Sequence, residues 1–163
     1  MLMDENLKYE KLKELLETSV SETIENIAFM EVTPSDSSDI FLTDEEIITT
    51  SLMVCSPVEC NFKLSMPKNL LIEITQTIYS PVDNIDNKII DNKILDDTLS
   101  EILNTIAGRF LNKVLPENQE FKLGVPEIIE EFVLEENERR YNFNIEGEEF
   151  FLVVSCENLL NVL

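Results

Sequence analysis

The sequence predicts an α+β fold: an antiparallel sheet of about five to six strands packed with long helices. The first observation is the order of the expected elements, which is helix, strands, two helices and strands again. This order is typical of α+β proteins, in which helices pack on an antiparallel sheet. The second is an internal repeat, which predicts two pseudo-symmetric halves. The third is size: 163 residues, 44% of them hydrophobic, suit a single domain over residues 1–163.

Two long helices are expected to open the two halves. In the first, from about Glu5 to Met30, leucine and isoleucine recur at helical spacing. The second contains Asp96–Phe110 and ends near Leu115. A further helix lies between them: Pro67 fits its first turn, and Asn69–Tyr79 continues it.

Five stretches are expected to be strands, and they cluster in two groups. Turn-forming residues at 33–39 separate the first helix from the first group of strands, and a surface loop at 81–93 lies between the second and third helices. The loop contains the triplet DNK twice, but it lacks the alternating acidic positions and central glycine of a calcium site. The predicted strands are Ile47–Ser56, Glu59–Met66, Glu120–Val125, Arg139–Glu146 and Glu148–Cys156. Hairpins are expected through Ser56-Pro57-Val58 and at Gly147.

The composition excludes several kinds of chemistry. The chain has no histidine, which removes Ser-His and Cys-His nucleophiles and His-ligated metals. Its only glycines are Gly108, Gly124 and Gly147, so there is no glycine-rich phosphate loop. A net charge of −21 disfavours binding to nucleic acid and to anionic membranes.

Cysteine content and hydropathy favour a cytoplasmic protein. The cysteines are odd in number and form no CxxC motif, so we expect three buried reduced side chains at Cys55, Cys60 and Cys156. No apolar run approaches the roughly 20 residues of a membrane span. The charged N-terminus lacks the apolar core of a signal peptide.

An eight-residue segment occurs twice. Ser21–Ala28 (SETIENIA) aligns without gaps on Ser100–Ala107 (SEILNTIA), with four identical residues. Each copy lies in the helix that opens one half, which favours two halves built on one plan. Shared apolar spacing between two unrelated helices is the alternative explanation.

One face of the second long helix carries an unusual set of residues. At about 100° per residue, Asp97, Glu101, Asn104 and Gly108 fall within roughly 60° of one another, opposite a broad apolar face. Asn and Gly are poor helix formers. Glu101 and Asn104 are i,i+3 neighbours and project together, and Gly108 leaves bare backbone beside them. An ordinary solvated face is the alternative, because Glu and Asn three residues apart often occur by chance.

The residues around this face resemble a known family. Asp97, Glu101 and Asn104, followed after 21 residues by Pro126, resemble the signature of the CheC/CheX/FliY phosphatases of bacterial chemotaxis. The text LSEILNTIAGRFLNKV and then FKLGVPEII is most similar to CheX, and the resemblance runs from about Ser21 to Cys156. The spacing to Pro126 is up to a residue short of the CheC-type pattern.

The resemblance implies a phosphatase that acts on the aspartyl phosphate of a CheY-like response regulator. Such an enzyme has no nucleophile and no cofactor of its own, because the receiver supplies the phosphoryl group and its Mg²⁺. Asn104 is then expected to orient the attacking water and Glu101 to pair with a cation of the receiver. Asp97 and Gly108 are expected to assist docking. Asp97 would do so as a charge that caps or steers the N-terminal end of the helix.

The resemblance also bears on the first copy and on assembly. There Glu22 is present, but Glu25 stands at the Asn position and Asn26 points about 100° away. We therefore expect the first-half site to be degenerate. CheX-like proteins form homodimers through sheet edges, and this chain is expected to do the same.

Two other functions remain open from the sequence. The main alternative is a non-catalytic module of the same fold that binds a response regulator or a flagellar switch component. A carboxylate metal site built from Asp96, Asp97 and Glu101 is disfavoured, because adjacent helical residues point about 100° apart.

Overall fold

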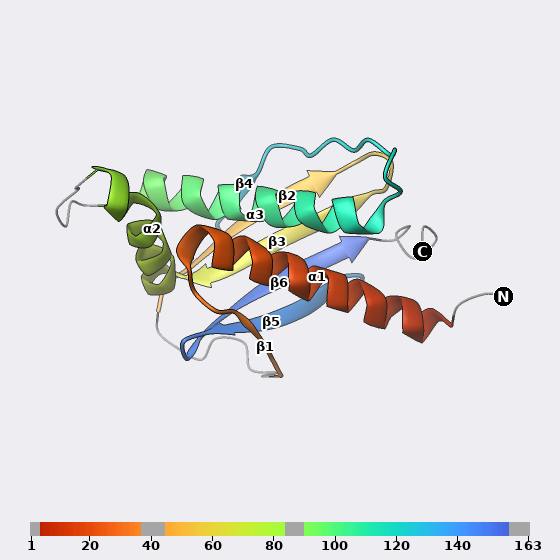
Figure 1. Ribbon diagram of the computed structural model, residues 1–163, viewed down its shortest axis with the longest axis horizontal. Helices are drawn as coiled ribbons and strands as arrows, with labels where there is room; N and C mark the ends of the chain where they lie inside the picture. The colour runs from red at the N-terminus through yellow and green to blue at the C-terminus, as the bar shows by residue number, and fades with distance from the viewer. Residues whose placement is uncertain (1–3, 37–44, 84–89, 157–163) are drawn as a thin grey trace.

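Six strands form one antiparallel sheet in the computed structural model, which describes residues 4–36, 45–83 and 90–156 (Figure 1). Their order across the sheet is β1-β5-β6-β3-β2-β4. The predicted class and the predicted number of strands are therefore confirmed. The strands are β1 (Thr33–Ser35), β2 (Ile47–Val54), β3 (Cys60–Pro67), β4 (Glu127–Ile129), β5 (Arg139–Ile145) and β6 (Glu148–Cys156).

The sheet confirms the two halves that the repeat predicts. Exchanging β1 with β4, β2 with β5 and β3 with β6 gives the same strand order, read from the other edge. The two hairpins, β2–β3 and β5–β6, meet through β3 and β6 at the centre. Each half thus contributes one hairpin, and its short first strand pairs with the hairpin of the other half.

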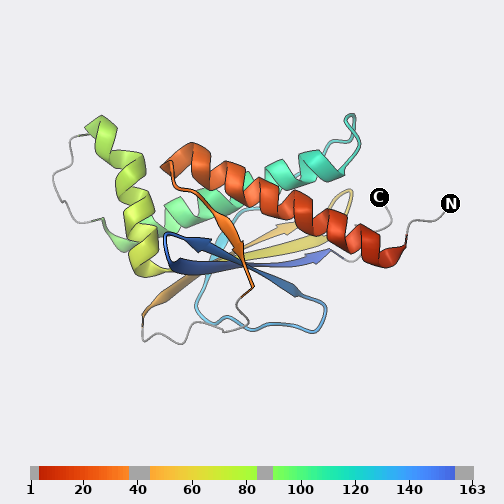
Figure 2. The same ribbon diagram turned by 60° about the horizontal axis from the view of Figure 1, so that its bottom comes forward.

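Two long helices, α1 (Glu5–Ala28) and α3 (Asn92–Val114), lie side by side across one face of the sheet, with α2 (Lys68–Asp83) at one end (Figure 1). Residues 130–138, which connect β4 to β5, pass below the opposite face (Figure 2). The main core lies between the helices and the sheet. Its largest fully buried side chains are Phe62, Phe110, Phe143, Phe150, Leu16, Ile24, Leu52, Leu64, Met66, Leu70, Leu71 and Ile74.

Side-chain caps define where the long helices begin. The carboxylate of Asp4 accepts a hydrogen bond from the Asn6 amide (3.3 Å), and that of Asp91 accepts one from the Ile94 amide (2.9 Å). The first helix ends earlier than predicted, because Phe29 adopts the left-handed conformation (φ 55°) and its N–H still bonds to a helical carbonyl. Asp91 and not Asp97 is therefore the N-cap of α3, which corrects the capping role expected of Asp97.

The tight turn between β5 and β6 depends on a glycine. Glu146 and Gly147 both have positive φ (49° and 91°), as a two-residue turn between twisted strands requires. The Gly147 amide also donates to the Asn144 side chain (3.0 Å). Both predicted hairpins are confirmed, and the peptide bond between Ser56 and Pro57 in the other one is cis.

Several predicted boundaries are wrong. No strand forms at 120–125: Leu123 makes an isolated bridge to Val54, and β4 begins after Pro126, which has no N–H to donate to a ladder. The turn-rich stretch that starts at Thr33 contains edge strand β1, held by pairing with β5. Pro67 ends β3 instead of opening the helix. Helices α2 and α3 both reach into the loop predicted at 81–93. Residues 84–89 of that loop lie outside the described residues.

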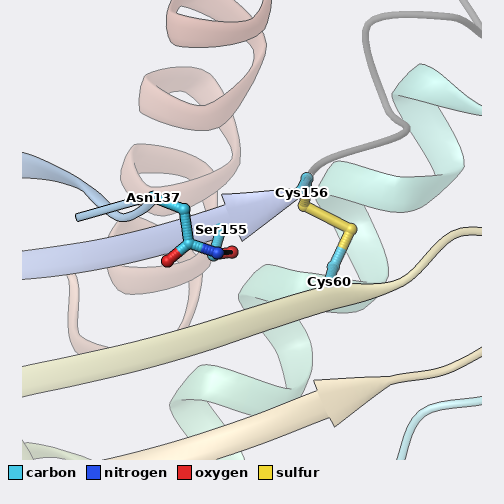
Figure 3. The surroundings of a disulfide bond; sticks show 4 residues. All are labelled: Cys60, Asn137, Ser155 and Cys156. Carbon is cyan, nitrogen blue, oxygen red and sulfur yellow. Dashed lines mark hydrogen bonds between the residues drawn. A yellow bond between two sulfur atoms is a disulfide. The ribbon is translucent and has the colours of Figure 1, made fainter. Parts of the chain in front are cut away.

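The cysteine prediction is also wrong. Cys60 and Cys156 are register partners on β3 and β6, with Cα atoms 4.3 Å apart, and form a disulfide (Figure 3). Cys55 is exposed. Beside the disulfide, Asn137 donates to the Ser155 hydroxyl (3.2 Å). Because disulfides are uncommon in the cytosol, the cysteines no longer support a cytoplasmic location.

Candidate functional site

The solvent face of α3 forms as the helical periodicity predicts. Asp97 and Glu101 are exposed, and Asn104 and Gly108 are partly exposed. The opposite face anchors the helix, which fixes the direction of these side chains relative to the sheet. The buried apolar residues of α3 are Leu95, Leu99, Ile102, Leu103, Ile106, Ala107, Phe110, Leu111 and Val114.

Glu101 and Asn104 are unpaired within the described part of the chain. Neither side chain makes a hydrogen bond or an ion pair with a described residue, although other polar side chains of this helix are engaged. Asp97 lies 3.9 Å from the Lys93 ammonium, in an exposed pair with little binding energy. A carboxylate and a carboxamide one helical turn apart are thus presented together to solvent.

The edge of the sheet runs beside the turn of α3 that carries Asn104. The Thr50 hydroxyl lies 3.2 Å from that of Ser100 and bonds to the Glu127 carbonyl at 3.3 Å, which fixes β4 near the start of this turn. Further along, Leu123 lies beside Gly108. Pro126 stands between these two contacts and is half-buried. The predicted signature residues Asn104 and Pro126 are therefore brought to the same region. No sequence pattern indicates the role of Thr50, because that role depends on the β2–β4 register.

Gly108 is not required by the packing of the described residues. A Cβ at this position would lie 3.9 Å from the Leu123 side chain, which is an ordinary van der Waals contact. Relief of a crowded contact therefore does not explain this glycine. A close approach from outside the chain remains an explanation.

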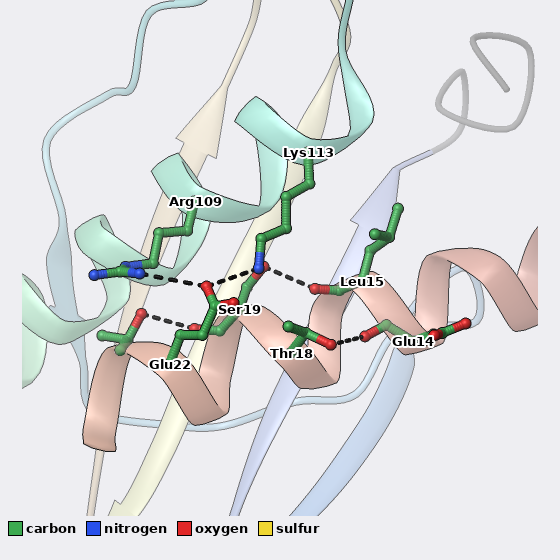
Figure 4. Close-up of polar contacts among 8 residues, drawn as sticks. Glu14, Leu15, Thr18, Ser19, Glu22, Arg109 and Lys113 are labelled. Atoms are coloured by element: carbon green, nitrogen blue, oxygen red, sulfur yellow. Dashed lines mark hydrogen bonds and ion pairs between the residues drawn. The ribbon is translucent and has the colours of Figure 1, made fainter. Parts of the chain in front are cut away.

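The corresponding face of the first half is different. The Glu22 carboxylate, equivalent to Glu101 in the repeat, lies 2.8 Å from the Lys113 ammonium and 3.3 Å from the Arg109 guanidinium, both on α3 (Figure 4). The hydrogen bond from Lys113 lowers the pKa of Glu22, and the positive charges of Lys113 and Arg109 lower it further. Glu25, at the position of Asn104, is exposed. The carboxylate of the first half is thus occupied by internal cations, an arrangement that the sequence did not reveal.

The described residues contain no cluster of three or more side chains that could hold a metal ion. Asp96, half-buried beside Asp97, has a pKa raised first by burial and second by the neighbouring negative charge.

Among the helices of the described ranges, none has the length and apolar character to span a bilayer.

Comparison with known proteins identifies the fold and the family. A family model described as chemotaxis phosphatase CheX matches residues 49–145, a range that includes Glu101, Asn104 and Pro126. No curated protein sequence matches the chain significantly.

Three solved structures resemble the chain over most of its length. A putative chemotaxis protein from Desulfovibrio vulgaris Hildenborough superposes with a TM-score of 0.69 at 11% identity, covering 90% of this chain and 97% of its own. Chemotaxis protein CheX from Vibrio vulnificus gives 0.69 at 14% identity, with 90% and 99% covered. CheX from Borrelia burgdorferi, in a complex with CheY, BeF3 and Mg²⁺, gives 0.64 at 14% identity, with 88% and 96% covered. At such low identity, these similarities establish the fold alone.

Proposed function

The chain belongs to the CheX family of chemotaxis phosphatases, and from this premise we propose that it hydrolyses the aspartyl phosphate of a CheY-like response regulator. The observation that carries the proposal is the unpaired Glu101 and Asn104 on the solvent face of α3. The Borrelia burgdorferi complex of CheX with CheY supports a receiver as the partner.

In the proposed reaction, Asn104 orients the water that attacks phosphorus. Its carboxamide offers both a donor and an acceptor and remains neutral beside a phosphate. The phosphoryl group moves to water, the phosphorus–oxygen bond to the receiver aspartate breaks, and the carboxylate of that aspartate leaves. The receiver supplies the Mg²⁺, and the chain contributes no cofactor. Phosphoryl transfer suits such a site, because catalysis consists of positioning and charge stabilisation.

The other residues of this face are proposed to hold the receiver. Glu101 forms an ion pair with a receiver cation, Asp97 steers that approach, and Gly108 lets the receiver backbone come close. Glu101 suits this role because no described cation of its own chain occupies its carboxylate. The first half, with Glu22 paired internally and Glu25 at the position of the amide, is proposed to be inactive.

The test is the loss of phosphate from a receiver in the presence of the protein. Asn104→Ala should fold normally and lose on the order of 10²-fold or more in kcat, by analogy with the loss of a positioning donor. Asn112→Ala is the matched control, because Asn112 is an exposed asparagine on the same helix. Equal decay rates for the wild type and Asn104→Ala would refute the role of Asn104.

A non-catalytic receiver-binding module is the second candidate, because the same fold can bind without turnover. The assay separates the two at substoichiometric protein. An enzyme dephosphorylates many receivers per molecule, whereas a binding module changes decay only in proportion to the complex formed.

We also propose a homodimer joined through sheet edges, with a cytoplasmic location that rests on the proposed response-regulator partner and not on the cysteines. The sheet ends in the edge strands β1 and β4, which are each three residues long, and the edge of a sheet is where a further strand can pair. Light scattering should give twice the chain mass of 18.8 kDa. A monomer at micromolar concentration would contradict this assembly.

A further inference from the structure

The edge of the sheet beside Asn104 contains a β-bulge. Ser51 pairs with Glu127, and Val54 bridges Leu123. Between these two pairs, β2 has the two residues 52–53, whereas the other segment has the three residues 124–126. One extra residue on one side of an antiparallel pair is a bulge, which bends the strand and redirects a side chain.

Gly124 fixes this bulge against β2. Its amide donates to the Met53 carbonyl at 2.9 Å. A Cβ at position 124 would lie only 2.7 Å from the same carbonyl oxygen, so any other residue would force the backbone of the two strands apart. The bulge is therefore set by a contact that only glycine permits.

The bulge leaves Val125 projecting into solvent. This side chain is 83% exposed, far more than the neighbouring Pro126. Single exposed apolar residues are common and need no explanation by themselves. Here, however, a glycine-dependent bulge holds the valine at the edge that flanks the unpaired Asn104.

The bulge lies beside the part of α3 that carries Asn104. Leu123 lies beside Gly108 of α3. At the other end of segment 123–127, the Glu127 carbonyl accepts from the Thr50 hydroxyl of β2, which lies 3.2 Å from that of Ser100 on α3. Val125 thus lies in the short segment between these two anchors, alongside the part of α3 that carries Asn104. A domain of about 100 residues has a radius of gyration of about 13 Å, so it covers both positions.

We propose that bulge 124–126 is a second docking contact for the receiver, in which Val125 packs against an apolar patch on that partner. This proposal rests on the proposed function. The two residues then have different roles. Asn104 acts on the phosphoryl group, whereas Val125 contributes affinity without touching the reacting atoms.

The matched pair Val125→Ser and Val133→Ser tests the contact. Val133 is also an exposed valine, but it lies in the connection that passes below the sheet, where its carbonyl accepts from Lys63. With a phosphorylated receiver as substrate, Val125→Ser should raise KM by on the order of tenfold and leave kcat unchanged, because buried apolar area is lost only in the complex. Val133→Ser should match the wild type.

Gly124→Ala provides a second variant. It should raise KM in the same direction at a temperature where its circular dichroism shows a folded protein. An unchanged KM in Val125→Ser overturns the docking contact, whatever the result for Gly124→Ala.

The failure of the proposed function is separately visible. If the wild type gives no turnover, the affinity of the wild type and the two variants for the receiver is measured by fluorescence titration. Weaker binding by Val125→Ser and by Gly124→Ala than by the wild type then supports the docking contact without catalysis. Equal binding by all, or no binding by any, overturns it.

Discussion

Removing the positive partner of one buried ion pair should destabilise the protein strongly. The Lys63 ammonium lies 2.7 Å from the Glu138 carboxylate, and these side chains are only 12% and 2% exposed. Lys63 also donates to the Val133 carbonyl at 3.2 Å. This pair fastens the connection between β4 and β5 to the centre of the sheet, on the face opposite the helices. Lys63→Met would leave the Glu138 carboxylate buried without a cation.

The expected cost follows from the burial. An uncompensated buried charge typically costs about 3–5 kcal/mol. For a chain of this size, each kcal/mol lowers Tm by about 2–4 °C, so Lys63→Met should lower Tm by about 6–20 °C. The double variant Lys63→Met/Glu138→Leu should recover most of this loss, because one Glu138 oxygen is already without a partner in the described structure.

Thermal and urea unfolding followed by circular dichroism measure both effects. Lys68→Met is the control, since its pair with Glu46 (3.3 Å) is more exposed, at 30% and 67%, and should contribute at most about 1 kcal/mol. A loss below 1 kcal/mol in Lys63→Met, or an equal loss in the double variant, would refute the reasoning. The kcat of the folded variants should not change, because the pair lies on the face of the sheet away from α3.

Three other predictions concern the ion pairs, the caps and the cysteines. Because the pKa of Glu22 is lowered in the folded protein, its pairing stabilises the fold above its usual pKa of 4.5 and is lost as pH falls through the folded value. Glu22→Gln should therefore lower the free energy of unfolding at pH 7 by at most about 1 kcal/mol, since Glu22 is 43% exposed. This difference from the wild type should vanish when the free energy of unfolding is measured at acid pH. Asp91→Ala should cost about 1 kcal/mol in urea unfolding by removing the cap of α3, with kcat unchanged. A thiol-reactive chromophore should detect Cys55 alone in the oxidised protein, and reduction of the bond between Cys60 and Cys156, 96 residues apart, should lower the free energy of unfolding by up to about 4–5 kcal/mol.

Features that depend on local periodicity were predictable from the sequence. The solvent face of α3 follows from apolar residues at helical spacing, and the β5–β6 hairpin follows from Gly147 between two alternating stretches. The candidate pair Glu101 and Asn104 was found because it lies within one helix, where spacing alone fixes the relative direction of two side chains.

Features that depend on distant pairing were not predictable. Strands β1 and β4 are three residues each and exist because hairpin edges are available to pair with them. The disulfide follows from the β3–β6 register, which places Cys60 opposite Cys156. The bulge at Gly124 likewise follows from a mismatch between two registers of β2. In each case, residues far apart in the sequence supply the contact that decides the local structure.

The two halves differ in whether the carboxylate at the repeated position is paired within the chain. In the repeat, Glu22 and Glu101 occupy equivalent positions, and α1 and α3 lie side by side. Arg109 and Lys113 of α3 reach across to Glu22, whereas no described cation of α1 reaches Glu101. A carboxylate already paired with two internal cations has little attraction left for a cation of a partner. The carboxylate of the second half keeps its full attraction, and it is the one that stands beside an amide.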